Sequence, residues 1–183
     1  MTLVIDNGGG TIKAGMDLQE EPSLYANMTA RVSKSMQYLV SEQIYECRDG
    51  SSLNFIRPCD RGYLNNWQCE IDVWTYMLNQ PCFSNASPNE TALVLTEPPV
   101  NPTTLQNDTN EVMFEYFGFK EYTRRPSVWF SMNEFCYRKE WNSEGLNSCV
   151  VVDSGFSFTH AVPFVDRVCK KHAVSLNLLV INL

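Results

Sequence analysis

The sequence predicts an α/β fold in which helices cover the faces of a mixed sheet. Apolar segments of strand and helix length follow one another in the order three strands, helix, strand, helix, strand, helix. A glycine turn between two strands at the start of the chain has a second copy 147 residues later. The 183 residues are 44% hydrophobic and 12% aromatic, which is enough apolar material to bury a core.

The first part of the chain predicts three strands followed by an insertion. Residues 3–6 and 11–15 are apolar strands on either side of the glycine turn, and a third strand is expected at residues 24–26. Residues 27–57 are polar and have no regular period, so they predict a small inserted subdomain.

The next segment predicts a helix and a buried strand. Asn65 or Asn66 can cap the helix after Gly62. Its apolar positions recur every three or four residues, predict its core face, and are Trp67, Ile71, Trp74 and Leu78. Residues 92–96 form a short apolar run before Glu97-Pro98-Pro99, as expected of a buried strand.

Two further helices and two strands are expected in the rest of the chain. Asn101 is predicted to cap the second helix, Pro102 to open it and Gly118 to end it. Its predicted apolar face consists of Leu105, Val112, Met113 and Tyr116. A strand is expected at 119–123, a helix from Pro126, a loop at 142–147 and a new strand at 149–152. The apolar stripe of the last helix is Val128, Met132, Phe135 and Cys136.

The repeated turn is the most informative feature of the sequence. A tight turn of small residues presents backbone N–H groups that can surround phosphate oxygens, and the aspartate before it can hold a hydrated divalent cation. One such turn is usually only a turn, whereas two copies in register predict a cleft that holds a nucleotide from both sides. The candidate phosphate-binding residues are Asp6, Asn7, Gly8, Gly9, Gly10 and Lys13 in the first copy and Asp153, Ser154, Gly155, Phe156, Ser157 and His160 in the second.

Asp6 and Asp153 are also the candidate ligands of a metal ion, because each follows an apolar strand directly. Lys13 can pair with phosphates as a point charge, and its simpler interpretation is a solvated lysine at a strand edge. His160 has the simpler interpretation of an interior histidine with satisfied hydrogen bonds. These alternatives stay open at the level of the sequence.

Charge and composition argue against several other classes of protein. The net charge of −7 and the short basic pairs Arg124-Arg125 and Lys170-Lys171 make direct nucleic-acid binding an unfavoured expectation. No secretory signal precedes Asp6, and the apolar residues 173–183 fall short of a membrane span, so we expect an intracellular protein without a membrane partner. Seven cysteines lie more than nine residues apart, which favours reduced thiols over a zinc site.

Several segments resemble the actin family. The two hairpins are similar to its first and second phosphate loops, GYLNNW at 62–67 to the segment before its first long helix, and LTEP at 95–98 to its next strand. Residues 101–102 and 110–115 continue the similarity, which runs from Leu3 to about Val174. Within the family, residues 62–67 and 153–160 look most like a nuclear actin-related protein. The resemblance implies an actin-like, ribonuclease H-like α/β fold.

The resemblance also predicts a division into lobes. Residues 1–147 are expected to form the first actin-like lobe, with the inserted subdomain at 27–57, and residues 148–183 to begin the second lobe. The family's second half closes the cleft and supplies most adenosine contacts. From Ala173 the sequence loses the expected glycine-bearing turn, so we expect a second lobe truncated after its first strands. A genuine short form, a spliced product and a gene-model error remain alternatives.

The function implied by the resemblance is that of a binding subunit. It implies a nuclear protein that joins a chromatin-remodelling complex, contacts its protein subunits, reaches the nucleosome indirectly and helps exchange a variant histone. ATP or ADP with magnesium is the implied ligand. We expect no catalysis, because the family orients the attacking water with a glutamine, and spacing from Tyr122 puts that position on Ser127, which is too short. Ser157 also replaces a glycine usual in the second loop.

Two enzymes remain as alternatives. The paired hairpins favour an actin-like ATPase that polymerises in the cytoplasm as part of the cytoskeleton. The other alternative is a phosphotransferase of the wider sugar-kinase and heat-shock ATPase superfamily. Residues 62–67 and 96–102 argue against the phosphotransferase, because they resemble actins specifically.

Overall fold

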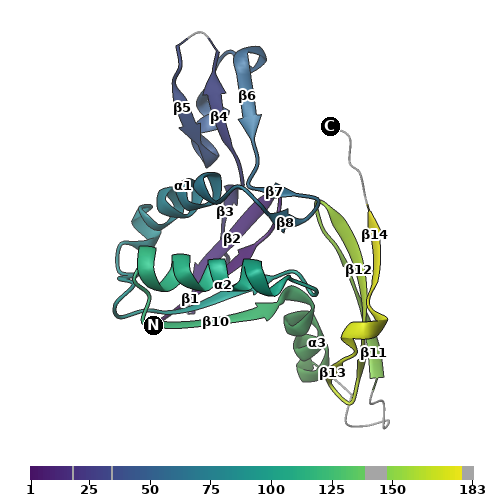
Figure 1. The fold of residues 1–183 in the computed structure, drawn as a ribbon. Helices are drawn as coiled ribbons and strands as arrows, with labels where there is room; N and C mark the ends of the chain where they lie inside the picture. The colour runs from purple at the N-terminus through teal and green to yellow at the C-terminus, as the bar shows by residue number, and fades with distance from the viewer. Residues whose placement is uncertain (18, 34, 139–147, 179–183) are drawn as a thin grey trace.

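The centre of the molecule is a mixed five-stranded sheet with helices packed on it, as predicted. The computed structural model describes residues 1–17, 19–33, 35–138 and 148–178. The strand order is β10-β9-β1-β2-β3, with β1, β9 and β10 parallel and β2 and β3 antiparallel to their neighbours (Figure 1). The strands are β1 (Thr2–Asn7), β2 (Thr11–Met16), β3 (Ser23–Ala26), β9 (Ala92–Glu97) and β10 (Glu121–Pro126).

Within the described residues, three α-helices follow in the predicted order. They are α1 (Trp67–Leu78), α2 (Thr103–Glu111) and α3 (Ser127–Arg138). The main core joins the sheet to α1 and to the turn after α2 through Leu3, Ile5, Trp74, Leu93 and Met113. Helix α3 instead packs on the second sheet, where Val128 and Met132 meet Val162 and Phe164. The first two helices therefore cover one sheet and the third belongs to the junction with the other (Figure 1).

Helix α1 has the predicted limits but a different buried face. Asn66 caps it, since the Cys69 N–H donates to the Asn66 side chain over 3.2 Å. The residues it buries completely are Glu70, Val73, Trp74 and Met77. Of the predicted stripe only Trp74 is fully buried, while Trp67, Ile71 and Leu78 are partly buried. Trp67 and Leu78 still pack against the main core, but the spacing of large apolar residues does not reveal that Glu70 lies on the buried face.

Helix α2 departs from its predicted start and face. Asn101 does not cap it, because its Nδ2 donates to the carboxylate of Glu97 over 3.0 Å. A wide π turn at Val112–Tyr116 continues the helix and rotates the later residues, so Met113 is buried whereas Tyr116 is 62% exposed. Gly118 ends the segment with a φ of +76°, as predicted.

Residues 27–57 fold into a small sheet of their own, with strand order β5-β4-β6. Its strands are β4 (Thr29–Val32), β5 (Tyr38–Val40) and β6 (Leu53–Ile56), with short 3₁₀ turns at Ser41–Glu46 and Gly50–Ser52. Met28, Ala30, Leu39 and Ile44 make up most of a separate core. The strands escaped prediction because each is only three or four residues long, which is too short to display a period.

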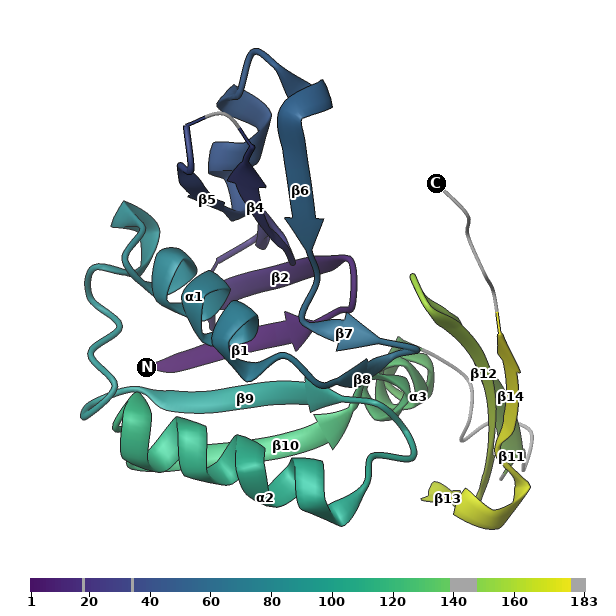
Figure 2. The same cartoon turned by 45° about the horizontal axis from the view of Figure 1, so that its top comes forward.

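The chain after α3 forms a second antiparallel sheet. Its strands are β11 (Ser148–Ser154), β12 (Phe158–Val165), β13 (Val168–Cys169) and β14 (Ser175–Leu178), and both β13 and β14 pair with β12. Figure 2 shows this sheet beside the two-stranded hairpin of β7 (Cys59–Asp60) and β8 (Tyr63–Leu64). The short turns Pro81–Phe83 and Lys171–Ala173 complete the described elements. The predicted loop at 142–147 lies outside the described residues.

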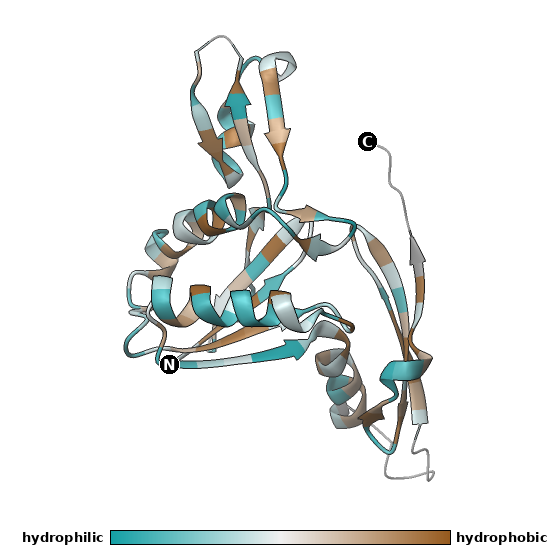
Figure 3. Cartoon of the chain, in the orientation of Figure 1, coloured by the Kyte–Doolittle hydropathy of each residue, from teal (hydrophilic) through white to brown (hydrophobic). Residues whose placement is uncertain are grey.

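The predicted strand at 119–123 lies further along the chain than expected. Phe119 is a buried core residue before the strand, and β10 runs to Pro126. In Figure 3 the ribbon of α2 is largely hydrophilic, and so is that of the edge strand β10, whereas β9 and the strands of the second sheet carry hydrophobic stretches. Among the described helices none is long and apolar enough to cross a membrane.

An aromatic residue of the second sheet fixes its position against the β7–β8 hairpin. Phe158 of β12 lies directly over Gly62, which joins β7 to β8 with a φ of +75°. A Cβ atom at Gly62 would lie 2.1 Å from Phe158 Cε2. The Tyr63 ring is also near, with its centroid 6.0 Å from that of Phe158. The junction of the two sheets therefore requires glycine at position 62 for space as well as for backbone conformation.

Gly62→Ala is predicted to destabilise the chain more than Gly118→Ala. Both positions have nearly the same positive φ, so both substitutions cost roughly 1–2 kcal/mol of backbone strain. Only Gly62→Ala adds a collision, which costs a further 1–3 kcal/mol or so, because nothing lies within 4 Å of a Cβ at Gly118. Urea unfolding of the two variants measures the difference. Equal losses of unfolding free energy would contradict the packing of Phe158 on Gly62.

Candidate functional site

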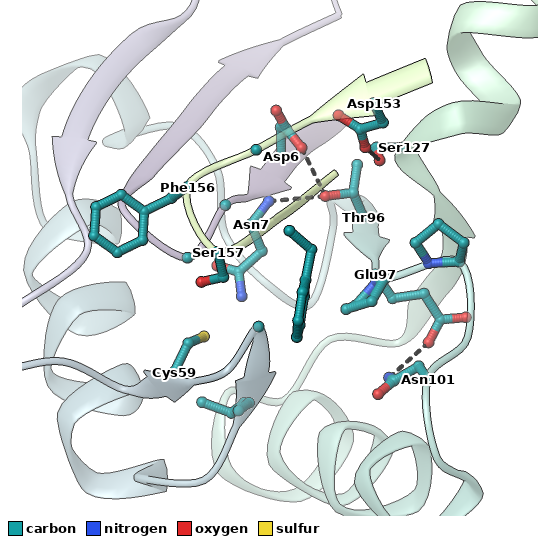
Figure 4. A pocket seen from close by; sticks show the side chains of 18 of the residues that line it. Asp6, Asn7, Cys59, Thr96, Glu97, Asn101, Ser127, Asp153, Phe156 and Ser157 are labelled. Carbon is teal, nitrogen blue, oxygen red and sulfur yellow. Dashed lines mark hydrogen bonds between the residues drawn. The ribbon is translucent and has the colours of Figure 1, made fainter. Parts of the chain in front are cut away.

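The two predicted hairpins line one cavity. It has a volume of about 460 Å³ and lies where the β1–β2 hairpin meets the β11–β12 hairpin (Figure 4). Every residue predicted as a site residue borders it: Asp6, Asn7, Gly8, Gly9, Gly10, Lys13, Asp153, Ser154, Gly155, Phe156, Ser157 and His160. Asp6 and Asp153 thus lie at neighbouring strand ends and border the same space. The structure brings the predicted residues together, and their roles toward a ligand remain a proposal.

The two hairpins repeat each other in register as well as in sequence. Asp6 pairs with Lys13 across β1 and β2, and Asp153 pairs with His160 across β11 and β12. In both hairpins the strand-end carboxylate thus stands opposite the residue seven positions later. The repeated sequence therefore reflects a repeated geometry, with a basic or imidazole side chain beside each carboxylate.

The first hairpin is anchored through Asn7 at the end of β1. The Asn7 N–H donates to Thr96 Oγ1 over 2.9 Å, which ties the turn to β9. Its side-chain oxygen accepts from Trp74 Nε1 over 3.0 Å, and its Nδ2 donates to the carboxyl of Glu70. Both partners come from the buried face of α1. Asn7 thus borders the cavity, and hydrogen bonds to β9 and α1 hold it in place.

Glycine lets the two turns approach closely. A Cβ at Gly8 would lie 2.5 Å from the Thr11 carbonyl oxygen of the same turn. A Cβ at Gly10 would lie 2.7 Å from the Phe156 ring, and one at Gly9 would lie 3.4 Å from Ser157 Oγ. The Arg57 guanidinium stacks on Phe156, 4.6 Å from the ring centroid. The tips of the hairpins are therefore in direct contact.

Each strand-end carboxylate accepts a hydrogen bond from a hydroxyl group of a neighbouring element. Thr96 Oγ1 donates to Asp6 over 2.8 Å, and Ser127 Oγ donates to Asp153 over 2.7 Å. Lys13 is the further partner of Asp6 at 3.4 Å, and its side chain is 53% exposed. Ser127 stands at the position from which the family resemblance predicts water orientation. In this chain its proton is instead committed to a carboxylate.

His160 is nearly buried at the wall of the cavity. It borders the cavity but is only 8% exposed, and Phe158 packs on its ring with 5.6 Å between centroids. Burial lowers the pKa of His160, and the charge of Asp153 acts in the opposite direction. A neutral imidazole beside Asp153 is therefore the favoured form at neutral pH.

The far end of the cavity is polar and was not predicted as part of the site. Glu97 accepts from Asn101 over 3.0 Å and pairs with Arg124 at 3.3 Å. Thr96 and Glu97 end β9, which is parallel to β1, and Arg124 lies near the end of the parallel strand β10. Ligands of open α/β sheets bind at the carboxyl ends of parallel strands. That rule, applied to residues 96–97, is the signal that could have found them.

The charges around the cavity suit an anion that binds together with a metal cation better than an anion that binds alone. Asp6, Asp153 and Glu97 face Lys13 and Arg124, which leaves one net negative charge when His160 is neutral. Mg²⁺ is commonly held by one or two carboxylates together with water and phosphate oxygens, so Asp6 and Asp153 fit its needs. The described residues include no cluster of three or more aspartate, glutamate, histidine or cysteine side chains that could hold a metal ion.

Comparison with known proteins identifies the family. The family model described as Actin matches residues 1–178. Actin-related protein 6 of Drosophila melanogaster is 34% identical over 89% of this chain and 41% of its own length. The Arabidopsis thaliana actin-related protein 6 is 32% identical over 94% and 42%, respectively. The chain thus spans about two fifths of the length of these relatives.

The comparisons agree with the predictions made from the motifs. The matched region includes residues 62–67 and 153–160. These motifs resemble a nuclear actin-related protein, and the similarity to actin-related protein 6 confirms the resemblance to an actin-related protein. The mixed sheet with flanking helices covers part of the actin fold, as expected. On the family match, this chain belongs to the actin family.

Proposed function

We propose that this chain is a non-catalytic, actin-related binding subunit of a nuclear chromatin-remodelling complex that exchanges a variant histone. Support for the subunit role comes from the similarity to proteins named actin-related protein 6. Support for the absence of catalysis comes from Ser127, whose hydroxyl proton is committed to Asp153 over 2.7 Å. That hydrogen bond is the single observation on which the non-catalytic part of the proposal depends.

In this proposal the cleft holds ATP or ADP with magnesium as a structural ligand. The Gly8–Gly10 turn and the Ser154–Ser157 turn surround the phosphates, and Asp6 and Asp153 hold the hydrated metal ion. The bound ion supplies positive charge that offsets the net negative charge of the cavity walls. A ligand held between the two hairpins would stabilise their junction by mass action, and with it the surface offered to partner subunits.

An actin-like ATPase of the cytoplasm and cytoskeleton is the competing function. It is favoured by one observation, that all the predicted phosphate and metal residues border one cavity. The two proposals differ in whether phosphate is released and in what the chain associates with.

Partner association tests the subunit role. Tagged chain expressed in cells of its own organism is expected in the nucleus, co-purifying with the catalytic and histone-binding subunits of a variant-histone exchange complex. An Asp6→Asn, Asp153→Asn double variant tests whether this association needs a filled cleft, since it removes both proposed metal ligands with little change of shape. Recovery in cytoplasmic filaments, without the exchange complex, would favour the cytoskeletal alternative.

Phosphate release tests the non-catalytic role. Purified chain with magnesium and ATP is expected to release phosphate no faster than the Asp153→Ala variant. Hydrolysis requires a water held in line with the γ-phosphate, and loss of a positioning group costs orders of magnitude in rate. Steady release by the native chain that disappears in Asp153→Ala would overturn the proposal in favour of the ATPase.

Binding of ADP is expected to require magnesium and to be weakened by salt. Chelation of the metal ion should abolish binding in calorimetry, because the cavity walls are net negative without it. Lys13→Ala should weaken binding up to about fivefold, since exposed ion pairs contribute at most about 1 kcal/mol. Lys120→Ala is the matched control, because Lys120 is exposed and does not border the cavity. Equal affinity with and without magnesium would rule out the metal-bridged arrangement.

A further inference from the structure

A carboxyl group is buried directly beneath the first hairpin. Glu70 of α1 has no exposed surface, and its Oε1 accepts from Asn7 Nδ2. Its second oxygen, Oε2, has no hydrogen-bond partner. Burial raises the pKa of Glu70 to about 7, against the opposing effect of the neighbouring amides of Asn7 and Asn27. An ionised carboxylate with an unpaired oxygen would be costly in this position.

Asn27 links this carboxyl group to the glycine turn. Asn27 is fully buried, its N–H donates to the Gly10 carbonyl over 3.0 Å and its Nδ2 donates to the Gly8 carbonyl over 3.0 Å. Its side-chain oxygen Oδ1 has no partner. Rotating the amide by half a turn would give Glu70 a donor but would set two oxygens against each other at Gly8. The arrangement as it stands lacks one proton.

We propose that Glu70 is a positioning residue for the first hairpin, held as a neutral acid whose Oε2–H donates to Asn27 Oδ1. One proton then satisfies both unpaired oxygens. The Glu70–Asn27 hydrogen bond completes a chain from α1 to the carbonyls of Gly8 and Gly10. Ionisation removes the donor, places a carboxylate against Asn27 Oδ1 and loosens the hold on the turn. Only the expected effect of Glu70 on ADP binding rests on the function proposed above.

Burial and hydrogen bonding determine the protonation of Glu70, because no charged group among the described residues acts on it. The described titratable groups that interact with its charge are the thiols of Cys59 from β7 and Cys69 from α1. Burial raises the pKa of both thiols, that of Cys59 to about 12, so they stay neutral. The end of β1 and the segment between β3 and β4 contribute the amides of Asn7 and Asn27.

The direction of the pH effect follows from the raised pKa. The folded chain holds the proton on Glu70 more tightly than the unfolded chain, whose carboxyl titrates near 4.5. The folded state therefore loses stability as the pH rises between 4.5 and about 7. The Gly8–Gly10 turn is accordingly held in place below about pH 7 and loosened above it.

The test is a titration of the whole chain without nucleotide. Carboxyl-labelled glutamate followed by NMR from about pH 4 to 8.5 is expected to show Glu70 titrating near 7, far from its ordinary value of 4.5. The backbone amides of Gly8, Gly9 and Gly10 are expected to shift with the same midpoint. A Glu70 midpoint near 4.5 would overturn the proposal, and this measurement needs no variant to fold.

Glu70→Gln supplies the variant arm. Glutamine is neutral and can accept from Asn7 while donating to Asn27, so the Gly8–Gly10 signals should lose their transition near 7 and resemble the native chain at low pH. Glu111→Gln, at an exposed position, should titrate like the native chain. A His160→Gln variant removes the imidazole that borders the cavity, so that its own titration cannot contribute to the change in the glycine signals. A persisting transition near 7 in Glu70→Gln would contradict the proposal.

ADP binding with magnesium, measured across the same range, separates this inference from the proposed function. Affinity is expected to fall about tenfold per pH unit above 7 at most in the native chain, and to stay flat in Glu70→Gln. Absence of ADP binding at every pH would refute the proposed ligand while the titration still decides the role of Glu70. Binding that ignores pH while Glu70 titrates would show that Glu70 does not position the turn.

Discussion

Close contact between the tips of two hairpins is the constraint on which the cleft depends. Phe156 packs on Gly10, and Phe158 packs on Gly62, in both cases where a Cβ atom would collide with the ring. Arg57 also stacks on the Phe156 ring. Because these contacts fix one sheet against the other, the two strand-end carboxylates come to border the same cavity. Aromatic packing on glycine therefore determines the geometry of a site made of polar groups.

The polar network behind the first hairpin connects it to β9 and to α1. Asn7 connects β1 to Thr96 of β9 and to Trp74 and Glu70 of α1. A helix that buries a carboxyl group on its inner face loses hydrophobic contact there, and that loss is offset only if the group is hydrogen-bonded. The presence of Glu70 on this face thus links the core of the lobe to the conformation of the glycine turn.

The same hydroxyl that argues against catalysis also orders the cleft. Ser127 fixes the Asp153 carboxylate, just as Thr96 fixes that of Asp6. Two carboxylates held in this way are suited to keep a hydrated cation in place, which requires fixed oxygens but no proton transfer. Under the proposed function, these fixed carboxylates would hold a retained ligand that stabilises a binding surface.

The sequence by itself determined the order of the α-helices and of the strands of the main sheet, the repeated hairpins and the family. These features depend on local patterns, such as the apolar run before Asp153 and the three glycines after Asn7, that any fold of this chain must accommodate. Tertiary structure decided which face of α1 is buried, because the inward position of Glu70 depends on Asn7, which lies 63 residues away in the chain. It also decided the partners of Thr96 and Ser127, since the neighbour of a hydroxyl group is set by strand packing rather than by sequence spacing.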